Sequence, residues 1–171
     1  PKSSKDFGKD VLPAMLNAGE KMFSYRFSGY WKDVGTISSL WESNMDLLGD
    51  EPAFDVGDSD WKIHSRNPLA PPEYLGEKAV VNNSLISLGC EIDGTVKHSV
   101  LSSNVVVEEG AEVIDSVLMA GSVVKKGAKV VYSIIDENTV VEEGAVGGNI
   151  RIGAGAKVAG GHILDKDYKG E

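Results

Sequence analysis

Three histidines, His64, His98 and His162, are the residues of this chain whose side chains most readily do acid–base or metal chemistry. Three imidazoles that converge on one point could bind Zn²⁺, but His64 falls in a segment rich in proline and glycine. His98, beside Lys97, is the best candidate for the catalytic histidine of an acyl transfer. Surface histidines without a chemical role are the default interpretation of all three.

Asp33 and Cys90 are two further reactive side chains. Asp33 lies in the stretch GYWKDVGT, and by residue type alone it is best explained as a cap of the turn before Ile37. Cys90 is the only cysteine of the chain, so it cannot form an internal disulfide. We expect it to be a small buried residue rather than a nucleophile.

The overall charge excludes several classes of partner. The chain of 171 residues has a formal net charge of −9 and no cluster of basic residues beyond Lys125-Lys126. Nucleic-acid backbones and anionic membranes attract basic surfaces, so neither is an expected partner. No apolar run approaches the ~20 residues of a membrane span. With one cysteine and no signal peptide, the cytoplasm is the expected compartment.

A six-letter word recurs along the second half of the chain. VVEEGA occupies residues 106–111 and again 140–145, and VVKKGA occupies residues 123–128, which gives a period of 17 residues. Bulky aliphatic residues recur at intervals of six, six and five: Leu101, Val107, Val113, Leu118, Val124, Val130, Ile135 and Val141. Two residues earlier stands a residue that is smaller in most cases: Ser99, Val105, Ala111, Ser116, Ser122, Ala128, Ser133 and Thr139. Residues two apart share one face of a strand, so each unit is predicted to be a short strand followed by a corner.

Three such units make one coil of a triangular solenoid, a parallel β-helix whose coils stack at the ~4.8 Å spacing of paired strands. The glycine of each repeated word is expected at a corner with a positive φ. The charged pair before it alternates in sign from coil to coil, so opposite charges should stack, each rung contributing ~0–1 kcal/mol. Residues 80–96 have the same kinds of residue as the repeat, but the spacing of their aliphatic side chains departs from six, six and five. A six-residue unit starts again at residues 152–158. Roughly four to five coils therefore fit in the chain.

The chain before the repeat has two regions. In residues 1–48, Asp6 can cap a helix over residues 7–17, and Thr36 can cap another over residues 37–48. Between them MFSYRFS, residues 22–28, alternates aromatic and polar side chains and predicts a half-buried strand. Residues 49–76 contain four of the six prolines and predict an extended linker along a surface. Its expected apolar anchors are Trp61, Ile63, Leu69 and Tyr74.

The repeat resembles the hexapeptide-repeat left-handed β-helix, and the left hand is implied by this resemblance alone. The fold occurs in acyltransferases, in a class of carbonic anhydrases and in the C-terminal domains of sugar-nucleotide pyrophosphorylases. It therefore does not select a function by itself. The implied fold class is mainly β, a left-handed parallel β-helix preceded by a small α/β remnant of a nucleotidyltransferase domain.

The first 48 residues select among these families. DFGKDVLPAML and YRFSGYWKDVGTISSLWESNMDLL resemble the end of the catalytic domain of bacterial glucose-1-phosphate adenylyltransferase, also called ADP-glucose pyrophosphorylase. WKIHSRNPLAPPEYL resembles the interdomain segment of the same family. The resemblance implies a catalytic-domain remnant over residues 1–48, a linker over 49–76 and a β-helix domain over 77–171. Because the first residues, PKSSKDFGKD, lack a starting Met, we expect a C-terminal fragment of a longer protein.

This family transfers an adenylyl group from ATP to glucose 1-phosphate, giving pyrophosphate and ADP-glucose for glycogen biosynthesis. The resemblance implies Mg²⁺ held by two aspartates, of which Asp33 matches the second. The presence of Asp33 also favours the catalytic subunit over a non-catalytic paralogue. No nucleotide loop, catalytic basic residue or sugar-phosphate lysine is found in this sequence. The chain alone is therefore expected to be inactive and to serve oligomerisation or regulation.

The resemblance also implies partners: ATP and glucose 1-phosphate in the complete enzyme, and a homo-oligomer, tetrameric in the family, or a hetero-oligomer with a regulatory paralogue. Allosteric effectors of the family bind between the two domains. Lys97, Arg151 and Lys157 are basic and near predicted corners, but solvated surface charge is the simpler explanation of each. The alternatives are another β-helical sugar-nucleotide pyrophosphorylase, a hexapeptide-repeat acyltransferase that uses His98, and a β-helical carbonic anhydrase.

Overall fold

The computed structural model describes residues 5–64, 68–148, 151–152, 157–158 and 163–164. The chain divides into two compact units between Trp31 and Lys32, and each is described here by itself. His162 and residues 153–156 lie outside the described residues, as do the side chains of Arg151 and Lys157. Within the described residues, no helix has the length and apolar character that crossing a bilayer requires.

The first unit contains a π-helical turn, η1 (Phe7–Val11), that continues into helix α1 (Leu12–Asn17). Asp6 caps this segment as predicted, because its Oδ1 accepts a hydrogen bond from the Lys9 backbone N–H at 2.8 Å. Pro13 lies in the first turn of α1, where its missing N–H costs least. The helix ends at Asn17, and Gly19 follows it with a φ of 72°, which suits glycine.

The predicted strand over residues 22–28 is wrong for this structure. The segment has no secondary structure, and Phe23 and Tyr25 are 92% and 90% exposed. A strand exists only when another strand accepts and donates its backbone hydrogen bonds. No described segment of the chain pairs with residues 22–28.

The second unit begins with helix α2 (Ile37–Met45), which Thr36 caps as predicted. Thr36 Oγ1 accepts a hydrogen bond from the Ser39 backbone N–H at 3.1 Å, and Ser39 Oγ accepts one from the Thr36 N–H at 2.9 Å. This reciprocal pair satisfies two backbone donors at the helix start. The helix ends three residues before the predicted residue 48, because residues 46–47 turn away.

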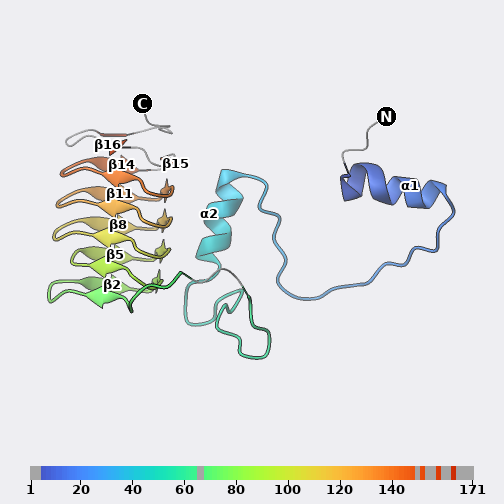
Figure 1. The fold of residues 1–171 in the computed structure, drawn as a ribbon, viewed down its shortest axis with the longest axis horizontal. Helices are drawn as coiled ribbons and strands as arrows, with labels where there is room; N and C mark the ends of the chain where they lie inside the picture. The colour runs from blue at the N-terminus through green and yellow to red at the C-terminus, as the bar shows by residue number, and fades with distance from the viewer. Residues whose placement is uncertain (1–4, 65–67, 149–150, 153–156, 159–162, 165–171) are drawn as a thin grey trace. The chain divides into compact units, whose positions relative to one another are not determined.

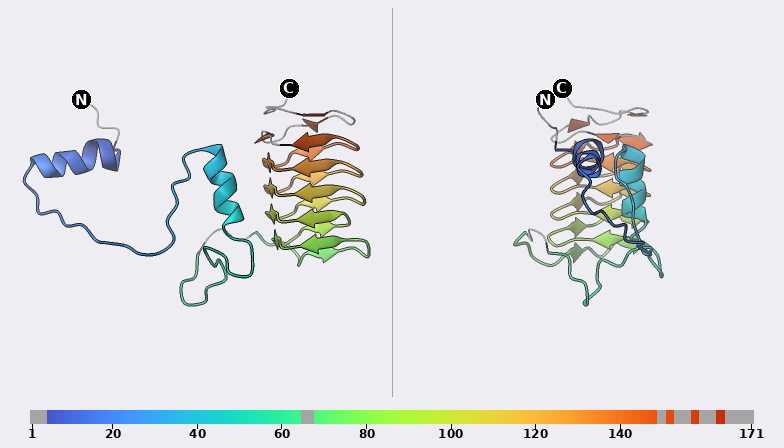
Figure 2. Two further views of the ribbon diagram at one scale, coloured as in Figure 1. Left: turned by 180° about the vertical axis from the view of Figure 1, so that it is seen from behind. Right: turned by 90° about the vertical axis from the view of Figure 1, so that its right-hand side faces the viewer.

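The rest of the unit is a parallel β-helix in which every strand pairs with the strand three places along the chain (Figure 1). The strands are β1 (Tyr74–Leu75), β2 (Val80–Asn82), β3 (Leu85–Ile86), β4 (Glu91–Ile92), β5 (Thr95–Lys97), β6 (Val100–Leu101), β7 (Val106–Val107), β8 (Glu112–Ile114), β9 (Val117–Leu118), β10 (Val123–Val124), β11 (Lys129–Val131), β12 (Ile134–Ile135), β13 (Val140–Val141), β14 (Val146–Gly148), β15 (Arg151–Ile152), β16 (Lys157–Val158) and β17 (Ile163–Leu164). They form three sheets, β1-β4-β7-β10-β13-β16, β2-β5-β8-β11-β14-β17 and β3-β6-β9-β12-β15. Figure 2 shows the coils stacked with their strands in register.

The core confirms the predicted inward positions. All eight bulky aliphatic residues of the repeat are at most 1% exposed, and so are the eight residues that precede them by two. The apolar residues among them belong to a single buried cluster along the axis. Burial of each large aliphatic side chain stabilises the fold by roughly 1.5–3 kcal/mol, so the coils hold one another in place through this axis.

The phase slip over residues 80–96 has a local cause. From β5 to β8 onward the strands pair at an offset of 17 residues, but Val80 pairs with Thr95 and Glu91 with Val106, an offset of 15. The corner between β4 and β5 has two residues, Asp93 and Gly94, where the equivalent corners of the next three coils have four. A Cβ on Gly94 would lie 2.6 Å from the carbonyl oxygen of Ala111, so only glycine fits this shortened corner.

The corners have the positive φ values that the repeat predicts, and one of the predicted pairs of opposite charge. Gly110, Gly127 and Gly144 have φ values of 75°, 67° and 70°. Lys125 Nζ lies 2.9 Å from Glu142 Oε2 on the next coil, which confirms one rung of opposite charges. In the rung below, Glu108 instead accepts a hydrogen bond from the backbone N–H of Lys126.

A column of serines joins the coils at another corner. Ser99 N–H donates to Ser84 Oγ, Ser116 N–H to Ser99 Oγ and Ser133 N–H to Ser116 Oγ, each at 3.1 Å. The hydroxyl of Ser116 in turn donates to the Ile114 carbonyl oxygen at 2.6 Å. The hydroxyls of Ser84, Ser99 and Ser116 therefore each accept from the next coil and donate within their own coil.

The segment between α2 and β1 lacks the expected apolar anchors. Trp61, Ile63 and Leu69 are 81%, 57% and 107% exposed. Instead, Asp55 accepts a hydrogen bond from the Gly57 N–H, and Asp58 accepts one from the Asp60 N–H. In these local turns, aspartate side chains accept hydrogen bonds from nearby backbone N–H groups. The segment folds back on itself (Figure 1).

Candidate functional site

Asp33 lies in the extended stretch immediately before α2, and its side chain is exposed. Thr36 performs the capping of α2, so the interpretation of Asp33 as a cap of this turn is not realised. Gly35 follows two residues later, and a Cβ there would lie 3.8 Å from Asp33 Oδ1, within ordinary contact distance. The carboxylate thus stands at the surface of the second unit with its oxygens accessible.

Lys32 fixes the backbone next to Asp33. Its ammonium nitrogen lies 2.7 Å from Asp46 Oδ2 and 3.3 Å from Glu42 Oε2, and the side chain is 23% exposed. The hydrogen bond to Asp46, supported by Glu42, raises the pKa of the Lys32 ammonium above its ordinary value. The ammonium therefore stays charged and binds the stretch before α2 to the last two turns of that helix.

Helix α2 is in turn attached to a corner of the β-helix (Figure 1). Trp41 Nε1–H donates to the carbonyl oxygen of Asp115 at 2.8 Å, and the Trp41 ring lies 4.3 Å, centroid to centroid, from the ring of Tyr132. Just after the helix, the Gly49 N–H donates to Asn83 Oδ1 at 2.9 Å. Two hydrogen bonds, one to the coil of Asn83 and one to the coil of Asp115, thus align the helix with the coils.

The corner that receives α2 has an unusual backbone. Asn83, His98, Asp115 and Tyr132 occupy equivalent places in successive coils, and their φ values run from 42° to 48°. We call these four residues the left-handed column. Asn and Asp tolerate this conformation, but a bulky aromatic residue such as Tyr rarely adopts it.

His98, the candidate histidine of the alternative acyltransferase interpretation, belongs to this column. Its Nδ1 lies 2.7 Å from Asp115 Oδ1 of the next coil, so the ring is held at a corner beside α2. The two pockets described for the structure have other linings. His64 is exposed in the segment before β1, and His162 lies outside the described residues. Within the described residues, His98 is therefore a corner residue paired with Asp115, and neither of these two pockets includes it.

A metal site would need more than Asp33. In the described part of the chain, no group of three or more His, Cys, Asp or Glu side chains is arranged to hold a metal ion. A carboxylate is nevertheless the ligand that hard divalent cations prefer, and Asp33 is free of the capping role that would compete for its oxygens. The residues present thus fit one ligand position of a shared site.

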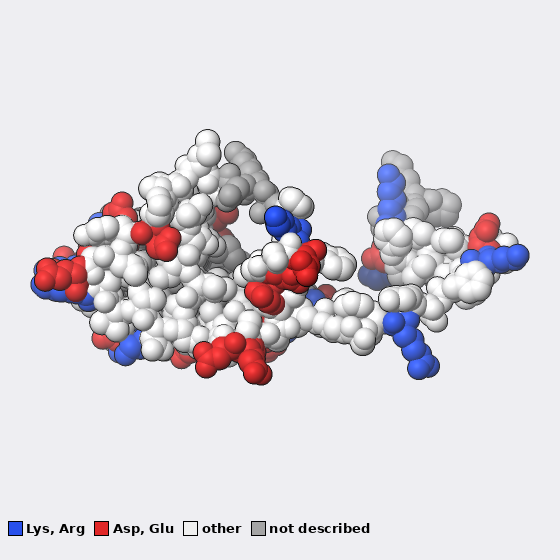
Figure 3. Space-filling view, turned by 90° about the horizontal axis from the view of Figure 1, so that it is seen from below, with Lys and Arg blue, Asp and Glu red and all other residues white. Residues whose placement is uncertain are grey.

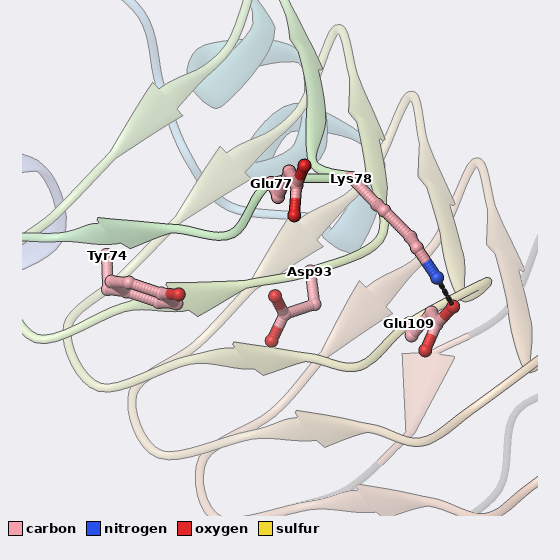
Figure 4. A pocket seen from close by; sticks show the side chains of 5 residues that line it. All are labelled: Tyr74, Glu77, Lys78, Asp93 and Glu109. Carbon is pink, nitrogen blue, oxygen red and sulfur yellow. Dashed lines mark hydrogen bonds and ion pairs between the residues drawn. The ribbon is translucent and has the colours of Figure 1, made fainter.

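A shallow pocket at the first coils was not foreseen from the sequence. Tyr74, Glu77, Lys78, Asp93 and Glu109 surround a volume of about 340 Å³ (Figure 4). Lys78 pairs with Glu109, which raises the pKa of the lysine and lowers that of the glutamate, chiefly through their hydrogen bond. Two carboxylates, Glu77 and Asp93, remain beside the pair, so the pocket does not suit a phosphate group. Figure 3 shows acidic side chains in several separate groups on one face, with basic side chains elsewhere on the same face.

Comparisons with known proteins match both parts of the chain. A family model described as "GlmU-like, C-terminal hexapeptide" matches residues 72–157, and one described as "Nucleotidyl transferase" matches residues 1–50. The hexapeptide match fits the left-handed β-helix that the resemblance implied. It spans the strands from β1 to the start of β16.

Several similar curated proteins share one name. Over 115 residues, the chain is 61% identical to proteins named glucose-1-phosphate adenylyltransferase from Bacillus thuringiensis (strain Al Hakam) and Bacillus anthracis. A relative of the same name from Bacillus mycoides (strain KBAB4) is 60% identical over the same length. The matched region is 67% of this chain but only 31% of each relative, so the chain spans about a third of their length.

Proposed function

Because the chain belongs to the family of GlmU-like C-terminal hexapeptide proteins, we propose that it is part of a glucose-1-phosphate adenylyltransferase. The observation that carries the proposal is the joint occurrence of two features in one chain. A nucleotidyl transferase match over residues 1–50 precedes the hexapeptide domain, and relatives at 61% identity bear this enzyme's name. An acyltransferase would leave the first match unexplained.

The proposed reaction joins ATP and glucose 1-phosphate. An oxygen of the sugar phosphate attacks the α-phosphorus of ATP, the bond to the β-phosphate oxygen breaks, and pyrophosphate leaves with that electron pair. The product, ADP-glucose, would serve glycogen biosynthesis. Since this chain has no assigned catalytic residue, we propose that residues 1–48 complete the catalytic domain, residues 49–76 form the linker and residues 77–171 form the β-helix domain.

We propose that Asp33 is a ligand of the metal ion, which we expect to be Mg²⁺. A divalent cation in such a site neutralises negative charge on the reacting phosphates. The part of Asp33 is to present a carboxylate oxygen at a fixed place. Its exposed position and the use of Thr36 as the helix cap support this role. The other ligands would come from outside this chain.

Substitution of Asp33 in the complete enzyme tests the proposal. Asp33→Asn keeps the size of the side chain and removes its charge, so ATP- and glucose 1-phosphate-dependent release of pyrophosphate should fall heavily. Asp60→Asn, at an exposed aspartate of the segment before β1, is the matched control and should leave turnover unchanged. Circular dichroism should show the same fold in all three proteins. Normal turnover of Asp33→Asn would remove the metal role.

The substrate itself needs a separate measurement. A panel of nucleoside triphosphates and sugar phosphates, assayed with the complete enzyme, should give the highest kcat/KM for ATP with glucose 1-phosphate. A clear preference for another nucleotide would favour another β-helical sugar-nucleotide pyrophosphorylase. The isolated chain should release no pyrophosphate with any pair, and release that depends on ATP would contradict the proposed division of labour.

We also propose that the β-helix takes part in an oligomer, either of identical subunits or with a regulatory paralogue. Strands β1, β2 and β3 are the edges of the three sheets at the first coil. Tyr74, Leu75 and Val80 on these strands are 59%, 50% and 49% exposed. Open strand edges with apolar side chains are ready to pair with another chain. Light scattering of the complete enzyme should give a mass above that of one subunit.

A further inference from the structure

We propose that Lys32 is a positioning residue for the metal ligand Asp33, and that it works by tying the stretch around Asp33 to the β-helix through α2. This inference rests on the proposed function, because it concerns the metal site of that reaction. The inference is based on a series of contacts that begins at Asp115 and Tyr132, passes through α2 and ends at Lys32, the residue before Asp33.

The first contact in the series is the clamp on Lys32. Its ammonium is held between Asp46 Oδ2 at 2.7 Å, at the C-cap of α2, and Glu42 Oε2 at 3.3 Å, on the helix four residues earlier. Two simultaneous ion pairs restrict a lysine far more than one, since each removes directions in which the side chain could swing. The backbone of Lys32 is joined directly to Asp33, so restricting one restricts the other.

The second contact fixes the helix itself. Trp41, on the same helix as Glu42, donates a hydrogen bond at 2.8 Å to the carbonyl oxygen of Asp115 and packs on the ring of Tyr132. Tyr132 holds a φ of 47°, a conformation that costs energy for an aromatic residue. The ring of this residue contacts Trp41, so the strained corner is also part of the interface with α2.

The charges around Lys32 distinguish positioning from substrate binding. Its one positive charge faces two carboxylates, so the cluster of Lys32, Glu42 and Asp46 has a formal charge of −1. Such a cluster does not attract a phosphate. The role left for the ammonium is to hold its neighbour, as groups behind a metal ligand commonly do.

The experiment measures metal dependence in the complete enzyme. Lys32→Met removes the clamp, Lys32→Arg restores a cation that can reach both carboxylates, and Asp46→Asn weakens the clamp from the other side. Lys62→Met, at an exposed lysine, is the control. Each protein is titrated with Mg²⁺ for pyrophosphate release, and with Mn²⁺ for direct binding by electron paramagnetic resonance.

Removal of a group behind a metal ligand commonly weakens metal affinity about 10-fold or more. Lys32→Met should therefore raise the half-saturating Mg²⁺ concentration and weaken Mn²⁺ binding by about that factor, while kcat at saturating Mg²⁺ changes little. Lys32→Arg should stay close to the parent protein. The double variant of Lys32→Met with Asp46→Asn should be no worse than Lys32→Met, because both remove one interaction. Tyr132→Ala should shift the same metal constants in the same direction.

Other outcomes would overturn the inference. If Lys32→Met raised the KM for a substrate while Asp46→Asn was silent, Lys32 would be a substrate contact. If metal constants stayed unchanged in Lys32→Met but rose in Asp33→Asn, the proposed function would stand and the positioning role would fail. If Asp33→Asn itself left metal binding unchanged, the metal role of Asp33 in the proposed function would fail.

Discussion

The indole of Trp41 donates a hydrogen bond at 2.8 Å to the backbone carbonyl oxygen of Asp115, a residue 74 positions later in the chain. The contact joins a helix of the region matched by the nucleotidyl transferase family to a corner of the β-helix. This hydrogen bond fixes α2 against the β-helix. The segment that connects them in the chain contributes local hydrogen bonds within its own turns.

Replacing Trp41 should loosen α2 without unfolding the coils. Trp41→Phe keeps a ring against Tyr132 and removes the donor to Asp115, a loss of about 1 kcal/mol. Backbone amides of α2 should then exchange with solvent about 5-fold faster in hydrogen-exchange measurements. Amides of β9 and β12 should be unaffected. Equal acceleration in helix and strands would mean that the hydrogen bond stabilises the whole unit rather than the docked helix.

Replacement of Tyr132 should affect the stability of its corner and the docking of α2 in opposite directions. Its φ of 47° suits asparagine better than tyrosine. Tyr132→Asn is therefore expected to leave the stability of the β-helix unchanged or to raise it, while amide exchange in α2 becomes faster. Thermal unfolding followed by circular dichroism and hydrogen exchange separate the two effects. A large fall in melting temperature would show that the ring supports the coils themselves.

The repeat could be predicted because one physical requirement fixes it. Every coil needs aliphatic side chains, such as that of Val113, that point to the axis. The sequence therefore shows aliphatic residues at intervals of six, six and five, and these are the residues that are buried. The positive φ of Gly110 was predictable for the same reason, since each coil must turn there. The shortened corner at Gly94 could be noticed only as a loss of phase, because the contact that demands glycine comes from the next coil.

The contacts of the candidate site could not be predicted in the same way. The pairing of His98 with Asp115 and the docking of Trp41 depend on which corners stack above one another and on which side a helix lies. The alternation of residues 22–28 indicated a strand, but a strand also needs a partner that the described chain does not supply. The signal that could have revealed the left-handed column is the spacing of Asn83, His98 and Asp115, which follows the coil period.

The serine column should stabilise the stack through its hydroxyl groups. Ser116→Ala leaves the N–H of Ser133 without its acceptor inside a buried corner, which costs about 1–3 kcal/mol. Denaturant unfolding should show this loss. Ser103→Ala, at a partly exposed corner serine, is the control and should change stability by less than about 0.5 kcal/mol. Equal losses in both variants would mean that the column contributes nothing specific.

Gly94 should be among the least replaceable residues of the β-helix. A Cβ there would meet the carbonyl oxygens of Ala111 and Glu108 at 2.6 and 2.7 Å, and neither backbone atom can move aside without breaking its coil. Gly94→Ala should lower the melting temperature strongly. Gly148→Ala is the matched control, because its nearest neighbour is 3.8 Å away. A melting temperature of Gly94→Ala close to that of the control would contradict the close approach of the coils.

Cys90 should react as a buried neutral thiol. It is fully buried, donates a hydrogen bond to the Ser102 carbonyl oxygen at 3.1 Å, and burial raises the pKa of its thiol. Because only the thiolate is nucleophilic, the folded protein should react with iodoacetamide much more slowly than the same chain in guanidinium chloride. Raising the pH should help the unfolded chain first, since its thiol ionises at a lower pH. Rapid labelling of the folded protein would show that the first coils open readily.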